Sequence, residues 1–302
     1  MIKIFIILLG ISFSATSFAE KGILFLAHGS MKHHQNKSCS IHGPTNWEQL
    51  VIEAVRSIKV NLKHESEVAF GMWNSKCFDK GIKRLEKSIQ SKGEELDHLI
   101  VLPIFVSSYS AVIEMQKFIF KKRPDRVIPI PSVVKTYFKH KITYLPAIDY
   151  NPQISMILSN RFHKLIHLAK QEGYKKDEME LVLVMHGPVS DQNNKKWIQM
   201  AEKYVTDISY LFPVKRTHII SLRDDAPREV RDIATKKLRE IVSIASTKGR
   251  KALVLPLLLS KGGIEQGILD RLIGLDYIWS GETLLPDEKI GPLLFQYLIN
   301  YI

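Results

Sequence analysis

The chain has 302 residues, of which 45% are hydrophobic and 25% are charged. These proportions are those of an ordinary globular protein and exclude a disordered or fibrous chain, and the length favours two domains. The formal net charge of +12 favours an anionic partner, unless the lysine and arginine clusters are only solvated surface. No interleaved basic and aromatic motif is present, so we expect no nucleic acid partner.

Residues 1–19 have the pattern of a secretory signal peptide. Lys3 precedes an apolar stretch over residues 4–11, and small residues lead to Ser17 and Ala19 before the expected cleavage site. We therefore predict a signal peptide at 1–19 and an exported, periplasmic protein. The apolar stretch is too short to cross a bilayer, and no later window is long and apolar enough, so we expect no membrane span.

Residues 23–30 read Ile-Leu-Phe-Leu-Ala-His-Gly-Ser, an apolar run that ends abruptly at His28 and Gly29. A run of this kind is typical of a buried strand in a parallel sheet. Further apolar runs and stretches of helical spacing follow it along the chain. We expect strands over 68–72, 99–106 and 142–145, and helices over 47–60, 78–89, 111–120 and 152–168.

The same order of elements then begins again. Residues 181–188 read Leu-Val-Leu-Val-Met-His-Gly-Pro, a second apolar run that ends at His186 and Gly187. We expect strands over 181–185, 217–222, 253–259 and 277–279, and helices over 197–211, 227–244, 264–273 and 286–302. Trp47 and Trp197 follow the two histidines, and a Leu-Pro pair occurs in the third strand of each half.

Strands that alternate with helices predict parallel sheets with right-handed crossovers. Because the landmarks recur in one order, we predict an α/β fold with two similar, doubly wound parallel-sheet domains and a cleft between them. The charged run over 171–180 separates the two copies. We therefore place an N-terminal domain at 20–172 and a C-terminal domain at 178–302.

His28 and His186 are the main candidates for chemistry. Ligands of open α/β sheets bind outside the carboxyl ends of the strands, which is where both histidines are expected. A neutral imidazole binds divalent transition metals and accepts protons near neutral pH, and the following glycine allows a sharp turn. The alternative is that each histidine only hydrogen-bonds a loop, but two histidines at equivalent strand ends favour a functional site.

Three segments resemble the class II chelatases. Within this family, the closest branch is that of the sirohydrochlorin cobaltochelatases and ferrochelatases. These segments are Phe-Leu-Ala-His-Gly-Ser at 25–30, Leu-Pro-Ile-Phe-Val-Ser at 102–107, and Leu-Pro-Leu-Leu-Leu-Ser-Lys-Gly-Gly at 255–263. The resemblance covers nearly the whole chain after residue 19, as two tandem copies of the family domain.

The resemblance implies a lyase that inserts Co²⁺ or Fe²⁺ into a cyclic tetrapyrrole such as sirohydrochlorin, without an organic cofactor. It implies that His28 or His186 binds the metal and helps to remove the pyrrole protons. An anionic tetrapyrrole and a divalent metal ion are thus the expected partners, and the positive net charge suits the carboxylates of the macrocycle.

The chain departs from the family where a second histidine or a glutamate is usual, just after the third strand of each half. Ala111 and Ile264 stand there, and neither can bind a metal or accept a proton. Glu114, one helical turn beyond Ala111, is a candidate catalytic residue, and Glu265 is a candidate metal ligand. The alternative is that both glutamates are ordinary surface acids.

The segment after His28 holds further candidates. His33, His34, Cys39 and His42 could together bind a divalent metal, although their spacing matches no strong metal signature. In an oxidising compartment Cys39 and Cys77 could instead close a disulfide, and two free thiols or shared metal ligation are the other options. Arg223 is expected either near a helix start or against a substrate carboxylate.

Two main hypotheses follow. The first is an exported chelatase with His28 and His186 as metal ligand and proton acceptor, assisted by Glu114 or Glu265. The second is a non-catalytic periplasmic protein that binds a metal or a tetrapyrrole on the same scaffold. A surface protein that binds polyanions is a third hypothesis, which depends on the net charge alone.

Overall fold

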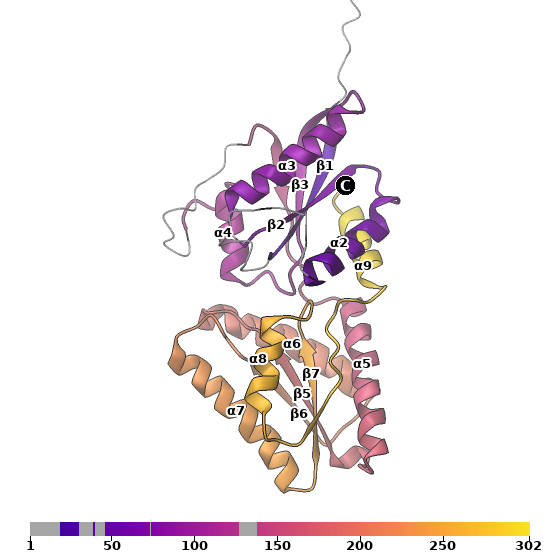
Figure 1. Cartoon of the computed structure of the whole chain (residues 1–302), viewed down its shortest axis with the longest axis vertical. Coiled ribbons are helices and arrows are strands. Elements are labelled where there is room, and N and C mark those ends of the chain that lie inside the picture. Colours follow the sequence, from indigo (N-terminus) through magenta and orange to yellow (C-terminus); the bar gives the residue numbers. More distant parts are fainter. Residues whose placement is uncertain (1–18, 30–38, 40–45, 73, 127–137) are drawn as a thin grey trace, which may run out of the picture.

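The computed structural model describes residues 19–29, 39, 46–72, 74–126 and 138–302. It contains two four-stranded parallel sheets flanked by helices, which confirms the predicted α/β fold with two similar domains (Figure 1). The predicted signal peptide lies outside the described residues except for Ala19, where the first strand begins. Within the described ranges, no helix combines the length and apolar character that crossing a membrane requires.

The first sheet has the strand order β2-β1-β3-β4. Its strands are β1 (Ala19–Ala27), β2 (Glu65–Phe70), β3 (Glu95–Pro103) and β4 (Lys141–Tyr144). One face packs against α3 (Ser75–Gln90) and α4 (Ala111–Ile119), and the other packs against α2 (Asn46–Lys59). The last six residues of β1 are all buried, as expected for a central strand that is covered on both faces.

The second sheet has the equivalent order β6-β5-β7-β8. Its strands are β5 (Met179–Met185), β6 (Arg216–Ser221), β7 (Lys251–Leu257) and β8 (Tyr277–Trp279), with a short 3-10 helix, η1 (Lys176–Glu178), before β5. One face packs against α7 (Arg228–Thr247) and α8 (Gly263–Leu272). The other packs against α5 (Pro152–Gln171) and α6 (Asp191–Leu211).

The two sheets pair their strands in the same register. Leu26 lies opposite Pro103 in the first sheet, and Val184 lies opposite Pro256 in the second. Two residues further along, His28 and His186 therefore follow the central strands at equivalent heights.

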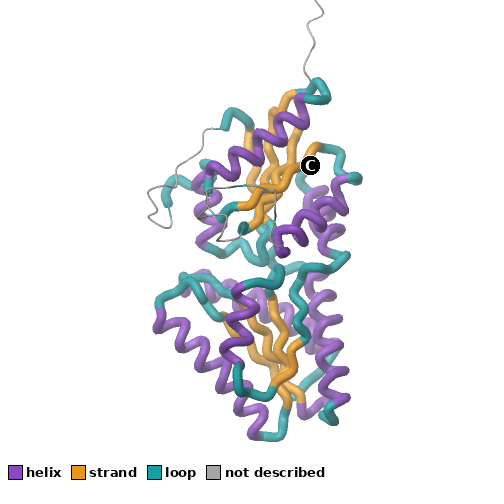
Figure 2. The backbone as a smooth tube through the Cα atoms, viewed as in Figure 1, coloured by secondary structure: helices purple, strands orange, loops and turns teal. Residues whose placement is uncertain are grey.

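Each half of the chain contributes one helix to the other half. Helix α5 follows β4 but packs against β7, β8 and α6 of the second sheet. Helix α9 (Ile290–Ile299) follows β8 of the second half but packs against α2 of the first half (Figure 2). The predicted boundary between 172 and 178 marks where the order of elements begins again. The chain already packs against the second sheet from α5 onward, before that boundary.

Helix bounds differ from the predictions where apolar residues give no signal. Helix α6 begins at Asp191 rather than at 197, because the Ser190 side chain caps it by accepting a hydrogen bond from the Asn193 N–H. Its first turns are polar, so apolar periodicity cannot detect them. The helix expected over 286–302 is shorter at both ends, since α9 covers only Ile290–Ile299.

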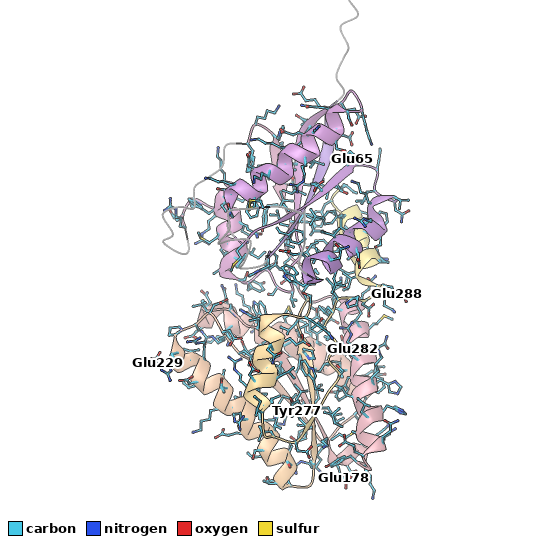
Figure 3. The ribbon with its side chains drawn as sticks, in the orientation of Figure 1. Glu65, Glu178, Glu229, Tyr277, Glu282 and Glu288 are labelled. Carbon is cyan, nitrogen blue, oxygen red and sulfur yellow. A yellow bond between two sulfur atoms is a disulfide. The ribbon has the colours of Figure 1, made fainter. Side chains whose placement is uncertain are left out.

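The carboxyl ends of both sheets point toward the junction between the two halves. Glu65 at the start of β2 lies in the outer part of the upper half, and Glu178 just before β5 lies at the far lower end (Figure 3). The segment after β3 contacts the start of α6, since Trp197 Nε1 donates a hydrogen bond to the Tyr109 carbonyl at 2.7 Å. Both strand-end histidines therefore lie on the sheet edges that face this junction.

Candidate functional site

His28 follows β1 and is held by its own turn. Its Nδ1 lies 2.8 Å from the carbonyl oxygen of Gly29, and its ring lies beside the rings of Trp47 and Phe105. Gly29 has a φ of +77°, and a Cβ there would lie 3.1 Å from the Gly71 nitrogen. Glycine is therefore favoured by the backbone angle, and the space for a Cβ is tight.

His186 repeats this geometry after β5. Its Nδ1 lies 2.8 Å from the carbonyl oxygen of Gly187, whose φ is +74°. Its Nε2 lies 3.5 Å from Oδ2 of Asp225, and its side chain is 27% exposed. A Cβ on Gly187 would overlap the Ser221 hydroxyl, so this glycine is required.

The two hydrogen bonds decide which ring nitrogen carries the proton in the neutral imidazole. A carbonyl oxygen only accepts, so Nδ1 of each histidine must carry the proton that it donates. In the neutral ring, Nε2 then has the lone pair, which is the tautomer of a metal-binding histidine whose other nitrogen is fixed by the protein. In this tautomer Nε2 is the ring atom that can bind a divalent metal or accept a proton, and in His186 a protonated Nε2 would face Oδ2 of Asp225 at 3.5 Å.

Arg223 holds the loop that carries His186. Its backbone N–H donates to the His186 carbonyl at 2.6 Å, and its guanidinium donates to the carbonyls of Pro188 and Val189 and pairs with Asp191 at 2.7 Å. Its φ of 57° is rare outside glycine. These contacts occupy the guanidinium, which one of our two expectations placed against a substrate carboxylate. Arg223 instead positions the loop, a role that no sequence signal indicated.

Aromatic and basic side chains line the contact between the two halves. The Lys196 ammonium lies 4.6 Å from the centre of the Tyr109 ring, next to the hydrogen bond between Trp197 and Tyr109. The Tyr204 hydroxyl donates to the Asp149 carbonyl at 2.7 Å and accepts from the Asn151 N–H. These contacts connect α6 to the segments that follow β3 and β4. A cleft shared by both histidines stays a prediction.

Glu114 lies in the first turn of α4, where its carboxylate pairs with Lys117 at 2.8 Å and with Arg123. Burial raises the pKa of Glu114, but the hydrogen bonds and charges of Lys117 and Arg123 outweigh it, so the pKa lies below its ordinary value. A carboxylate in this state is a weak proton acceptor. Its predicted catalytic role stays a prediction, and its observed partners are both cations.

Ala111 and Ile264 lie in the first turns of α4 and α8, just after the third strand of each sheet. Glu265 is half-buried beside Ile264 at the start of α8. The described residues contain no group of three or more histidine, cysteine or acidic side chains that could hold a metal ion. Glu265 as a metal ligand therefore stays a prediction.

Cys39 and Cys77 form a disulfide across 38 residues, which confirms the first of the three expectations for these cysteines. Shared metal ligation by the two thiols is thereby excluded. Cys77 lies in the first turn of α3, and its Cβ lies 3.3 Å from the place that a Cβ on Gly71 would take. Gly71 in turn lies next to Gly29, in the turn after His28. His33, His34 and His42 lie outside the described residues.

The fold is similar to that of known chelatases, although no family model and no curated protein matches the sequence. The structure of SirB from Bacillus subtilis with Fe3+ has a TM-score of 0.53 and 15% sequence identity, covering 92% of this chain and 95% of that one. The sirohydrochlorin chelatase SirB from Bacillus subtilis subspecies spizizenii, in complex with cobalt, has a TM-score of 0.50 and 15% identity, covering 92% and 93%. The chain thus has a class II chelatase-like fold.

Proposed function

We propose that this chain, with its class II chelatase-like fold, is an exported periplasmic lyase that inserts Co²⁺ or Fe²⁺ into an anionic tetrapyrrole such as sirohydrochlorin. It would need no organic cofactor, because the metal ion and the macrocycle are the two substrates. The observation that carries the proposal is the pair of strand-end histidines, each with Nδ1 bonded to the carbonyl of the next glycine.

The chemistry of insertion fits these two residues. A tetrapyrrole loses two pyrrole protons as a divalent metal enters, so the reaction needs a metal ligand and a proton acceptor. Nε2 of an imidazole fixed through Nδ1 can do either. In the proposed mechanism one histidine delivers the metal ion from Nε2, and the other takes up the two pyrrole protons one after the other and releases each to solvent.

The side chains at the junction suit an anionic, flat substrate. Aromatic rings lie beside His28, and Lys196 lies over Tyr109 where α6 meets the segment after β3. Apolar rings can contact the macrocycle, and the ammonium group can attract its carboxylates. The net charge of +12 acts over longer range in the same direction.

A non-catalytic binding protein is the alternative, and two observations favour it. Ala111 and Ile264 stand where the family resemblance implies a second ligand, and the carboxylate of Glu114 is paired with Lys117 and Arg123. A scaffold without a second ligand could still bind a metal ion or a tetrapyrrole through its histidines.

A metal-insertion assay tests the proposal. The full chain is incubated with sirohydrochlorin and Co²⁺ or Fe²⁺, and the absorbance change on insertion is followed against the uncatalysed reaction. We expect turnover that falls by about 100-fold or more in His28→Ala or His186→Ala, the size typical of a lost acid–base group. His167→Ala, at an exposed histidine on α5, is the matched control and should retain full activity.

Two results would contradict the proposal that the protein is a metal-inserting enzyme that uses these histidines. Tight binding of the tetrapyrrole without turnover would support the binding protein instead. Equal activity in all three variants would show that the strand-end histidines have no part in the reaction.

A further inference from the structure

A groove runs along the outer edge of the second sheet, apart from the two histidines. Strand β6 is the edge strand, with α6 on one face of the sheet and α7 on the other. The groove has a volume of about 270 Å³ between these three elements. Its apolar lining consists of Ile198, Ile219, Ile220, Val230, Ile233 and Ala234.

The first half of α7 leaves this groove open. The buried residues of α7 are Leu238, Val242 and Ala245, all in its second half, whereas Ile233 is 69% exposed. Glu229, the second residue of α7, lies at the outer edge of the lower half in Figure 3. A single exposed isoleucine is ordinary, but here it continues an apolar wall in which Ile220 is buried and the other lining groups are partly buried.

A cation stands at one end of this apolar wall. Val230, Ile233, Ala234 and Lys237 are spaced three and four residues apart, so they share one face of α7 and all line the groove. Lys237 has no acidic partner in the part of the chain that the structure describes, whereas the neighbouring Lys236 pairs with Glu240.

The polar groups at the other end are already satisfied. The Ser221 hydroxyl donates to Oδ1 of Asn194 at 2.6 Å, and the Arg223 guanidinium is engaged by loop carbonyls and Asp191. A second charged group on a ligand would therefore find no partner at this end. The groove combines an apolar channel with one available positive charge.

We infer that this groove binds a small amphipathic carboxylate, with its carboxylate on Lys237 and its hydrocarbon chain between α6, β6 and α7. The volume equals that of about nine water molecules, which suits the hydrocarbon chain of a medium-chain fatty acid. The inference does not depend on the proposed insertion of a metal, because none of the groove residues is a proposed ligand or proton acceptor.

The groove also touches the support of the histidine loop. The Ser221 side chain packs against Gly187, and the Arg223 guanidinium donates to the Pro188 carbonyl just after Gly187. Both side chains line the groove. A ligand in the groove therefore contacts side chains that position His186. We expect binding to shift the ring signals of His186 in an NMR spectrum.

Octanoate is the probe for the experiment, titrated into the full chain with its disulfide intact. We expect saturable binding, with a dissociation constant on the order of 1 mM or below. Histidine ring signals are followed in the same titration and assigned with His186→Ala. Absence of saturation at roughly ten times that concentration, or unchanged His186 signals, would overturn the inference.

Substitutions localise the binding. Lys237→Gln removes the cation and should weaken octanoate about fivefold, whereas Lys236→Gln, one residue along the same helix, should leave the affinity unchanged. Ala234→Trp should fill the groove and weaken binding at least about tenfold, with circular dichroism to confirm folding. An equal effect of Lys236→Gln and Lys237→Gln would mean attraction to surface charge in general, and an unchanged affinity in Ala234→Trp would place the ligand elsewhere.

Discussion

At the scale of single residues, the two candidate histidines depend on the glycines that follow them. Gly29 has a φ of 77° and Gly187 a φ of 74°. In this conformation the carbonyl oxygen of each glycine lies 2.8 Å from Nδ1 of the preceding histidine. A residue with a Cβ would adopt this backbone angle only at a cost in free energy. The tautomer of each imidazole is therefore set by the backbone of the next residue.

Gly187→Ala should lower stability more than its backbone angle alone explains. The new Cβ would overlap the Ser221 hydroxyl, whereas a Cβ on Gly274, which has a φ of +79°, meets nothing within 4 Å. We expect Gly274→Ala to cost about 1–2 kcal/mol of unfolding free energy, and Gly187→Ala about 1–3 kcal/mol more. Urea unfolding of both variants measures the difference, and equal losses would contradict the packing that we describe around Gly187.

At the scale of elements, the disulfide between Cys39 and Cys77 attaches the segment after β1 to the first turn of α3. Cys77 lies close to Gly71, whose N–H donates to the Ala27 carbonyl at the end of β1. The cross-link therefore acts beside the turn that carries His28. Its closure of a long loop restricts the unfolded chain more than the folded one.

Replacing both cysteines by alanine should destabilise the protein by about 4 kcal/mol, the loop-entropy value for a separation of 38 residues. Alanine is chosen because Cys77 is buried and serine would bury an unpaired hydroxyl there. Denaturant unfolding is compared for oxidised wild type, reduced wild type and the double variant. The reduced wild type should resemble the variant, and a reductant that leaves the wild-type midpoint unchanged would contradict the cross-link.

At the scale of the whole molecule, the two halves are joined by an exchange of helices. Helix α5 completes the packing of the second sheet and α9 completes that of the first, so one hydrophobic core cluster contains residues from both halves. Tyr204 adds a hydrogen-bonded contact between α6 and the segment before α5. We expect the halves to unfold together, because neither keeps its apolar faces covered without the other.

Leu294→Ala tests this exchange. Leu294 is fully buried in α9, and its truncation should cost about 2–5 kcal/mol. Amide hydrogen exchange should show reduced protection in β1 and α2, although Leu294 belongs to the last helix of the chain. Ile299→Ala, at a half-exposed position of the same helix, is the control and should change little. Reduced protection confined to the second sheet would refute the packing of α9 on the first half.

Much of the fold could be predicted because its signals are local. Apolar runs and helical spacing located all eight strands that the structure describes, and the recurrence of His-Gly predicted the equivalent turns after β1 and β5. Polar stretches gave no such signal, so the start of α6 at Asp191 was missed. The residue types and their distance from a strand end were sufficient to nominate His28 and His186.

The sequence by itself determined the order of strands and helices, the parallel sheets and the place of the two histidines, because each depends on neighbouring residues. Only the tertiary structure decided that α5 packs on the second sheet and α9 against α2 of the first half, that Arg223 binds the loop of His186, and that Glu114 is paired with cations. An apolar stripe shows that a helix must be covered, but it does not specify the partner, and the partners of a charged side chain depend on which segments the fold brings beside it.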